Sequence, residues 1–256
     1  MSLDMHAIPE TTDWNTQSIQ SLDHFNIQHE KITRCGLEIH NIQVEQLTTL
    51  AQLDDLYQHF NIFFPPNIKN AGLIRQLEFF TGRLAAKCAL HDLNLQDCVI
   101  HQGHQGEPIW PDAVIGSISH VSTQRLCCAI AYAQNHNCAD KTFGIDIESK
   151  RCQSFFQQND EIYHVFLSKD EQAALANIGF QKPDLYLLVF SAKESVIKAF
   201  YIKYNQIIDF KLINFNGIVG DFIYFRIHPV SSLKNISVTK VHFFDTDNEI
   251  ITISCI

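Results

Sequence analysis

Two carboxylates, Asp146 and Glu148, alternate with isoleucines in residues 143–148 (FGIDIE). In a β-strand, side chains two residues apart point to the same face and lie about 7 Å apart along the chain. Asp146 and Glu148 would therefore form a rigid, negatively charged platform on one face, while Ile145 and Ile147 would face a core. A half-buried edge strand with a solvated acidic face has the same pattern, and spacing alone favours that simpler interpretation.

Glu194 and Lys198 stand four residues apart in residues 190–199 (FSAKESVIKA). In a helix this spacing puts both side chains on one side of the cylinder, where they could contact a common ligand. An exposed ion pair worth about 0.3–0.5 kcal/mol has the same spacing and is common. Spacing does not separate these two interpretations.

Residues 116–120 (GSISH) end a predicted strand with small polar side chains and a histidine. Ser119 and His120 could bind a phosphate group or transfer a proton there, although a lone histidine is more often structural. His101 and His104 have an H-x-x-H spacing, but they lie in a predicted loop without a clear third ligand. A metal site at this pair is therefore disfavoured.

The first half of the chain predicts a helix followed by buried strands. Residues 70–90 place apolar side chains at helical spacing, with the cations Arg75, Arg83 and Lys87 elsewhere on the cylinder. A loop with glycines and prolines follows at 103–111. The predicted strands are residues 114–119, 126–133 and 143–148.

The second half predicts two helices and then more sheet. Glu171 follows Ser168 by three residues, a capping-box pattern that predicts a helix to Ala176, which Gly179 would stop. A longer helix is expected from Pro183 to about residue 204. The segments 222–228, 236–244 and 249–255 are rich in β-forming residues and predict a mostly antiparallel meander.

Composition limits the class of protein. The 256 residues are 46% hydrophobic, enough for one large domain or two smaller lobes, and the apolar runs are too short to cross a bilayer. The net charge of −9 argues against a broad nucleic-acid surface. The first thirty residues lack the pattern of a secretory signal, so a cytoplasmic location is expected. The eight scattered cysteines are expected to be free thiols.

Three motifs together resemble those of the 4'-phosphopantetheinyl transferase superfamily: GSISH at 116–120, GIDIE at 144–148 and FSAKESVIKA at 190–199. Two further segments, GRLAA at 82–86 and EPIWP at 107–111, resemble the group typified by enterobactin synthase component D, which serves nonribosomal peptide and siderophore assembly. The resemblance covers about residues 70–200.

This resemblance implies an α+β fold of two similar α/β lobes related by a pseudo-twofold axis, with the active site at the lobe interface. We expect residues 1–140 to form an N-terminal lobe with coenzyme A and nucleotide contacts. Residues 141–256 would form a C-terminal lobe with the metal-binding and catalytic motifs. The resemblance also implies a monomer.

The resemblance assigns the strand carboxylates and the helix glutamate to Mg²⁺, here Asp146, Glu148 and Glu194. Magnesium prefers oxygen ligands and completes its shell with water and phosphate oxygens. Without a cation, three gathered carboxylates would repel one another and at least one pKa would rise.

The resemblance also implies which residues contact coenzyme A, the co-substrate. Lys198 would contact the pyrophosphate, and Ser119 and His120 would contact phosphate groups. Arg75 and Arg83 are weaker assignments for the nucleotide end, and Lys193 is a further candidate. Where such proteins often carry a basic residue, this chain has Gln105, Gly106 and Glu107, so a phosphate contact is expected to be missing or supplied elsewhere.

The implied reaction moves 4'-phosphopantetheine from coenzyme A to a serine of an apo acyl, peptidyl or aryl carrier protein and releases adenosine 3',5'-bisphosphate. Asp146, Glu194 and Lys198 would be the catalytic residues, with Glu194 taking the serine proton and Lys198 assisting the leaving phosphate. Since carriers tend to be acidic and this chain is too, we expect an apolar docking contact, with Phe200 and Tyr201 as candidates.

Two other functions fit parts of the sequence. Ser195 and Lys198 match the S-x-x-K pattern of serine acyl-enzymes, but the pattern is short and its companion motifs are missing. A non-catalytic coenzyme A binding module is the second alternative. The presence of all three acidic residues and Lys198 argues against it.

Overall fold

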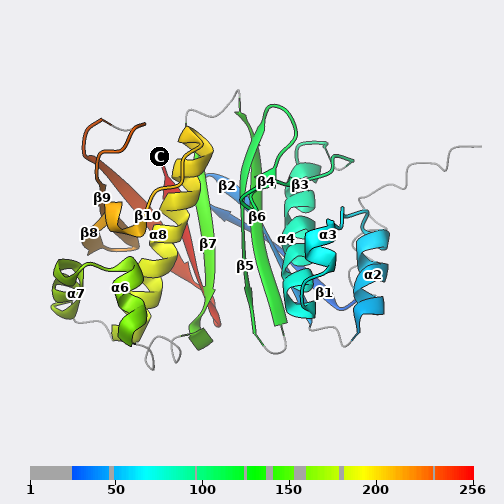
Figure 1. The fold of residues 1–256 in the computed structure, drawn as a ribbon, viewed down its shortest axis with the longest axis horizontal. Coiled ribbons are helices and arrows are strands. Elements are labelled where there is room, and N and C mark those ends of the chain that lie inside the picture. Colours follow the sequence, from blue (N-terminus) through cyan, green and yellow to red (C-terminus); the bar gives the residue numbers. More distant parts are fainter. Residues whose placement is uncertain are drawn as a thin grey trace, which may run out of the picture.

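The chain folds around two antiparallel β-sheets, and each sheet is covered by one long helix (Figure 1). The computed structural model describes residues 25–45, 49–95, 97–123, 126–136, 141–152, 160–178, 182–232 and 234–256. The four-stranded sheet has the order β1-β2-β6-β5, and the five-stranded sheet has the order β7-β11-β10-β9-β8. Helices and antiparallel sheets together give the α+β class predicted from the sequence.

The first sheet comes from the N-terminal part of the chain, and helix α4 packs against its strands β2, β5 and β6. A two-stranded ribbon, β3 with β4, lies apart from this sheet. The elements are β1 (Ile27–Arg34), β2 (Leu37–Glu45), α2 (Leu50–His59), α3 (Pro66–Lys69), α4 (Leu73–His91), β3 (His101–Gln102), β4 (Pro108–Ile109), β5 (Val114–Ser122) and β6 (Leu126–Asn135).

The second sheet comes from the C-terminal part, and helix α8 packs against β7, β10 and β11. Short 3-10 turns occur at Lys150–Cys152, Asp160–Ile162 and Phe210–Leu212. The remaining elements are β7 (Phe143–Ser149), α6 (Tyr163–Phe166), α7 (Lys169–Ala176), α8 (Lys182–Tyr204), β8 (Ile213–Val219), β9 (Phe222–Ile227), β10 (Ser237–Asp245) and β11 (Glu249–Cys255).

The two sheets meet where β5 and β7 run side by side in the centre of Figure 1. Two serine hydroxyls of β5 accept backbone N–H groups of β7: Ser117 from Ile145 at 3.3 Å and Ser119 from Ile147 at 3.4 Å. The sheets also share an apolar core. Its buried members are Leu37, Ile39, Cys128, Ile130, Tyr132, Ile145, Ile147, Ile251 and Ile253. Strand β7 is therefore fixed on both sides.

Gly144 allows helix α8 to approach β7 closely. A Cβ atom at this position would lie 1.9 Å from the Ser195 carbonyl oxygen and 2.4 Å from the Ala199 nitrogen. Only a residue without a side chain fits such an approach. The glycine thus explains part of the GIDIE motif, because it sets the distance between the strand and the helix that carry the acidic residues.

Most predicted elements are confirmed. The helix expected at 70–90 is α4, the capping box of Ser168 and Glu171 begins α7, and the long second-half helix is α8. The C-terminal strands form the expected antiparallel meander, and the seven described cysteines are free. Gly179, which was predicted to stop α7, and the eighth cysteine, Cys138, lie outside the described residues. None of the described helices is long and apolar enough to cross a membrane.

The sequence reasoning missed strand β8 and the β1–β2 hairpin. The hairpin did leave a signal: its two-residue turn is Cys35-Gly36, and both residues have positive φ, at 54° and 77°. Hairpin turns of two residues favour this conformation, which glycine adopts without strain.

Candidate active site

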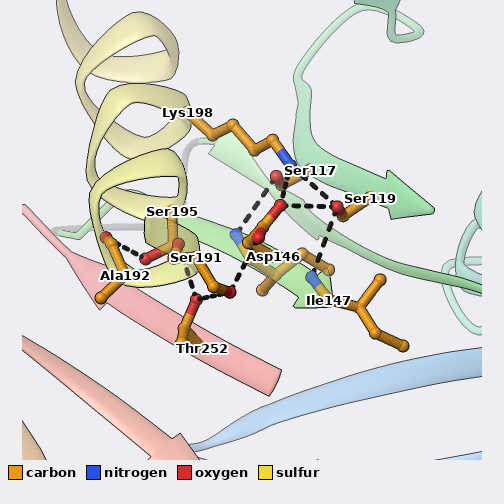
Figure 2. A network of polar contacts seen from close by, with 10 residues as sticks. Ser117, Ser119, Asp146, Ile147, Ser191, Ala192, Ser195, Lys198 and Thr252 are labelled. Atoms are coloured by element: carbon orange, nitrogen blue, oxygen red, sulfur yellow. Dashed lines mark hydrogen bonds and ion pairs between the residues drawn. The ribbon is translucent and has the colours of Figure 1, made fainter. Parts of the chain in front are cut away.

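Asp146 stands at the centre of a buried polar network between the two sheets (Figure 2). Its carboxylate Oδ1 accepts the Ser119 hydroxyl at 2.7 Å and binds the Lys198 ammonium at 2.6 Å. Its Oδ2 accepts the Ser191 hydroxyl at 2.7 Å. Only 3% of Asp146 is exposed. Three elements, β5, β7 and α8, therefore contribute to a single carboxylate.

Ser119 has no hydrogen-bonding capacity left over. Its hydroxyl donates to Asp146 and accepts both from Lys198 Nζ, at 2.9 Å, and from the Ile147 N–H, at 3.4 Å. A hydroxyl has one donor and two acceptor positions, so all three are in use. This serine locks the orientation of Asp146 and Lys198 relative to β5.

The opposite side of Asp146 is held by Ser191 and Thr252. The two hydroxyl oxygens lie 3.0 Å apart, and the Thr252 hydroxyl also reaches the Ser191 carbonyl at 3.0 Å. Thr252 is the neighbour of Asp146 in the β7–β11 ladder. Sequence reasoning did not single out Ser191 or Thr252. Ser191 lies within the FSAKESVIKA motif, whereas Thr252 becomes visible only once the pairing of β11 with β7 is known.

Glu148 and Glu194 share an electrostatic environment with Asp146. Burial, followed by the Asp146 carboxylate and then Glu194, raises the pKa of Glu148 to about 8, against the opposing effect of the Lys198 ammonium. Burial also raises the pKa of Glu194, with Asp146 acting in the same direction and Lys198 against it. The three carboxylates expected from the sequence thus lie close enough to repel one another.

This donor set fits a divalent cation that prefers oxygen. Asp146, Glu148 and Glu194 act electrostatically on one another, and Lys198 is the cation that opposes their mutual repulsion. Mg²⁺ binds through a few carboxylates and keeps coordination positions for water and phosphate. Asp146, Glu148 and Glu194 are the residues that would hold it.

His120 and Arg75 lie next to each other beside the network. Arg75 Nη1 lies 3.0 Å from His120 Nε2 and 3.3 Å from the Glu78 carboxylate. Burial lowers the pKa of His120 most, and Arg75 and Lys198 lower it further against Glu78 and Asp146. Since Arg75 can only donate, His120 accepts at Nε2 in this contact. Glu78, held by the Ser122 hydroxyl at 2.6 Å, belongs to the cluster and was missed from the sequence.

Arg83 is buried and makes its hydrogen bonds to backbone carbonyl groups. It is 6% exposed, donates to the carbonyl oxygens of Ile100 and His101, and stacks 4.4 Å from the centre of the Phe79 ring. Burial lowers its pKa to about 10. The expectation that Arg83 binds the nucleotide does not fit these contacts, because its guanidinium is already used to fix the chain that follows α4.

Lys193 also requires a correction. Its side chain is completely buried, and its ammonium contacts Glu171 Oε1 at 2.8 Å and the carbonyl oxygens of Phe166 and Phe210 at 2.6 and 3.3 Å. These three acceptors match the three protons of an ammonium group. Lys193 therefore joins α8 to Glu171 and to the backbone at Phe166 and Phe210. The expected contact between Lys193 and coenzyme A does not fit this buried position.

An apolar cleft of about 470 Å³ opens beside Lys198. Trp110 and Ser117 line one wall, and residues of α8, among them Ile197 and Tyr201, line the other. Burial raises the pKa of the Tyr201 hydroxyl, and Glu107 raises it further. Glu107 thus lines the cleft. It belongs to the segment 105–107, in which this chain has no basic residue for a phosphate contact.

Two sequence-based candidates prove to be core residues. Ser195 is fully buried and donates to the Ala192 carbonyl at 2.8 Å, while Lys198 turns to Asp146. The S-x-x-K acyl-enzyme alternative therefore lacks an accessible nucleophile. Phe200 is also fully buried, so it cannot contact a carrier protein, whereas Tyr201 is partly exposed and lines the cleft.

Family models match both parts of the chain. The model for the 4'-phosphopantetheinyl transferase N-terminal domain matches residues 65–132, and the model for the 4'-phosphopantetheinyl transferase superfamily matches residues 142–254. The second match includes β7 and α8, which carry Asp146 and Lys198.

Similar proteins come from several bacteria. Enterobactin synthase component D of Salmonella typhimurium is 30% identical over 187 residues, which are 73% of this chain and 74% of that protein. The Escherichia coli K12 protein of the same name is 32% identical, covering 58% of this chain and 66% of its own length. The 4'-phosphopantetheinyl transferase Svp of Streptomyces mobaraensis is 35% identical, covering 48% and 47%. The chain therefore belongs to the 4'-phosphopantetheinyl transferase superfamily, a family of enzymes.

Proposed function

We propose that this protein transfers the 4'-phosphopantetheine group from coenzyme A to a serine of an apo carrier protein and releases adenosine 3',5'-bisphosphate. One observation carries the proposal: Lys198 of α8 and Ser119 of β5 both contact Asp146 of β7, and the Asp146 carboxylate acts electrostatically on Glu148 and Glu194. This combination supplies oxygen ligands for a divalent cation and a positive charge for a diphosphate.

In the proposed reaction, a bond forms between the carrier serine oxygen and the phosphorus that bears pantetheine. The bond from that phosphorus to the bridging oxygen of the diphosphate breaks, and the adenosine bisphosphate leaves with the electron pair. Mg²⁺ bound at Asp146, Glu148 and Glu194 would neutralise charge on the diphosphate. We assign the serine proton to Glu194, the acidic residue that α8 carries about one turn before Lys198.

We propose that the Lys198 ammonium moves from Asp146 to the diphosphate during this reaction. Its ammonium now contacts Asp146 at 2.6 Å, and 27% of its side chain is exposed. With a divalent cation at the carboxylates, Lys198 can turn to the diphosphate and stabilise the charge that develops on the leaving oxygen. His120 and Arg75 lie on the neighbouring side and are the proposed contacts for the remaining phosphate oxygens.

The cleft beside Lys198 is the proposed path for the pantetheine arm. It begins next to the phosphate-binding residues, and its walls are mainly apolar, which suits a chain of methylene and dimethyl groups interrupted by amides. The carriers would be those of nonribosomal peptide or siderophore synthases, because similar proteins are named enterobactin synthase component D. We further propose that the protein acts as a monomer in the cytoplasm.

Labelling of apo carriers with a fluorescent coenzyme A tests the function. The wild-type protein should label a carrier in Mg²⁺ and lose this activity in EDTA, as measured by gel and intact mass. Asp146→Ala and Glu194→Gln should abolish labelling, whereas Asp55→Asn, on the exposed face of α2, should not. If coenzyme A binds but no carrier is labelled, the protein is a binding module; near-normal turnover in either site variant would refute the residue assignment.

A further inference from the structure

Three metal-ligating side chains meet on the first sheet, away from the Asp146 network. His29 lies on β1, His40 on β2 and Cys88 on α4. One ligand atom from each residue lies within 4.8 Å of the other two. A fourth residue, Asp92, contacts His40. None of the four takes part in the candidate active site.

The fold brings these residues together for simple reasons. In the β1–β2 register, His29 pairs with Ile42 and Lys31 pairs with His40, so the two histidines are diagonal neighbours on one face of the hairpin. Cys88 and Asp92 are four residues apart at the end of α4 and share one side of that helix. Because α4 packs against β2, these two surfaces face each other.

The hydrogen bonds of His40 prepare one of its nitrogens for a metal. Its Nε2 lies 3.0 Å from the Asp92 carboxylate, which accepts a hydrogen bond from the Nε2–H group. The Nδ1 lone pair then faces His29 Nε2, also at 3.0 Å. A carboxylate behind a histidine is the usual arrangement at protein metal sites, since it fixes the tautomer and the ring orientation.

The distances are close to those of a tetrahedral site. With Zn–N bonds of about 2.0–2.1 Å and a Zn–S bond of about 2.3 Å, ligand atoms in a tetrahedron lie roughly 3.3–3.6 Å apart. The histidine nitrogens would separate by a few tenths of an ångström from their present 3.0 Å, and the sulfur would move inward from at most 4.8 Å. Both changes require the side chains to rotate from their present positions.

We propose that His29, His40 and Cys88 bind a divalent transition-metal ion of the Zn²⁺ class, with Asp92 orienting His40. Imidazole and thiolate ligands select such a metal, whereas the oxygen ligands at Asp146 suit Mg²⁺. His29 is exposed, which gives the ion access from solvent and leaves a fourth position for water. The ion would join the edge strand β1 to α4 and thereby stabilise the N-terminal part of the fold.

One charge opposes binding. The Lys31 ammonium lies 2.6 Å from the Asp92 carboxylate, and its side chain is 42% exposed. When Cys88 binds a metal, its thiol proton is released to solvent, and the resulting thiolate adds a negative charge that offsets this cation. Without a metal, the same contacts would be a hydrogen-bonded chain from His29 through His40 and Asp92 to Lys31. The experiment must therefore detect the sulfur–metal bond itself.

Co²⁺ titration of the full chain, purified in the presence of a chelator, detects that bond. We expect a sulfur-to-cobalt charge-transfer band in the near ultraviolet and intense visible bands of a tetrahedral site, saturating at one equivalent and lost on adding Zn²⁺. Cys88→Ser should remove the charge-transfer band. Cys98→Ser, which alters a partly exposed thiol beyond α4, should leave it unchanged.

Two further variants separate a metal site from a purely structural contact. His29→Gln changes an exposed residue and should weaken Co²⁺ binding at least tenfold, and Asp92→Asn should weaken it about 10–100-fold. The proposal is overturned if the wild-type protein shows no charge-transfer band, if the band survives Cys88→Ser, or if His29→Gln binds Co²⁺ as tightly as the wild type.

Discussion

Replacing Gly144 by alanine should damage catalysis more than stability. The added Cβ would lie 1.9 Å from the Ser195 carbonyl oxygen, and contacts below 3.0 Å are essentially never observed for real Cβ atoms. The backbone of α8 must therefore move away from β7 by about 1.1 Å, because neither contacting atom belongs to a flexible side chain. Such overpacking typically costs about 1–3 kcal/mol of folding free energy.

The same displacement acts directly on the proposed chemistry. Helix α8 carries Glu194 and Lys198, and Lys198 contacts Asp146 of β7 at 2.6 Å. A misplacement of about 1 Å can lower a rate about 100-fold, so we expect kcat/KM for carrier modification to fall by roughly that factor.

The assay compares carrier labelling rates at a temperature where urea titration shows the variant to be fully folded. Gly72→Ala is the matched control, since a Cβ at Gly72 meets nothing within 4 Å and its φ is −65°. A Gly144→Ala protein with a kcat/KM within twofold of wild type would show that the spacing of β7 and α8 does not position the site.

Three other predictions follow from the charges of the molecule. Lys193→Met should lower the free energy of unfolding by about 3–5 kcal/mol, measured by urea titration, because it leaves Glu171 buried without its partner, while kcat of the folded fraction stays within a few fold. In EDTA, the raised pKa of Glu148 means that this carboxyl stays protonated in the folded state at pH values where it is ionised in the unfolded state. The contribution of protonated Glu148 to the free energy of unfolding is therefore full below about pH 4.5 and is lost as pH rises through about 8. Thermal melts should show this loss, and Glu148→Gln should flatten it; a wild-type melting temperature that rises over the same range would contradict it. The KM for an acidic carrier should change little between low and high salt, because a chain with a net charge of −9 cannot attract it over a distance, and a steep dependence would contradict the apolar docking contact.

Local patterns in the sequence predicted the elements that carry the site. The alternation of Asp146 and Glu148 with isoleucines gave the correct orientation of β7, since Ile145 and Ile147 are buried in the core between the sheets. That core and the close approach of α8 also explain why Asp146 is buried and not on a solvated acidic face. The i, i+4 spacing of Glu194 and Lys198 placed both on one side of α8 as expected, although the observed ion pair of Lys198 is with Asp146.

Long-range contacts determine which lysine of the FSAKESVIKA motif faces the site, and local sequence patterns do not reveal these contacts. Lys193 and Lys198 belong to one motif, yet one is buried against Glu171 and the other contacts Asp146. Five residues correspond to about 140° around a helix beyond one full turn, so the two lysines face different surroundings. Which of them faces the site depends on where β7 packs, and that is a property of the tertiary structure.

The contact between β5 and β7 also has a consequence for aggregation. Each strand is the outermost one of its own sheet, and an uncovered outer strand is a template for aggregation. Here each covers the other, with the hydroxyls of Ser117 and Ser119 satisfying backbone groups that a foreign strand would otherwise recruit. A substitution that disrupts the contact between β5 and β7 would therefore expose two edge strands at once. Aggregation would then lower the yield of folded protein in addition to any loss of the proposed activity.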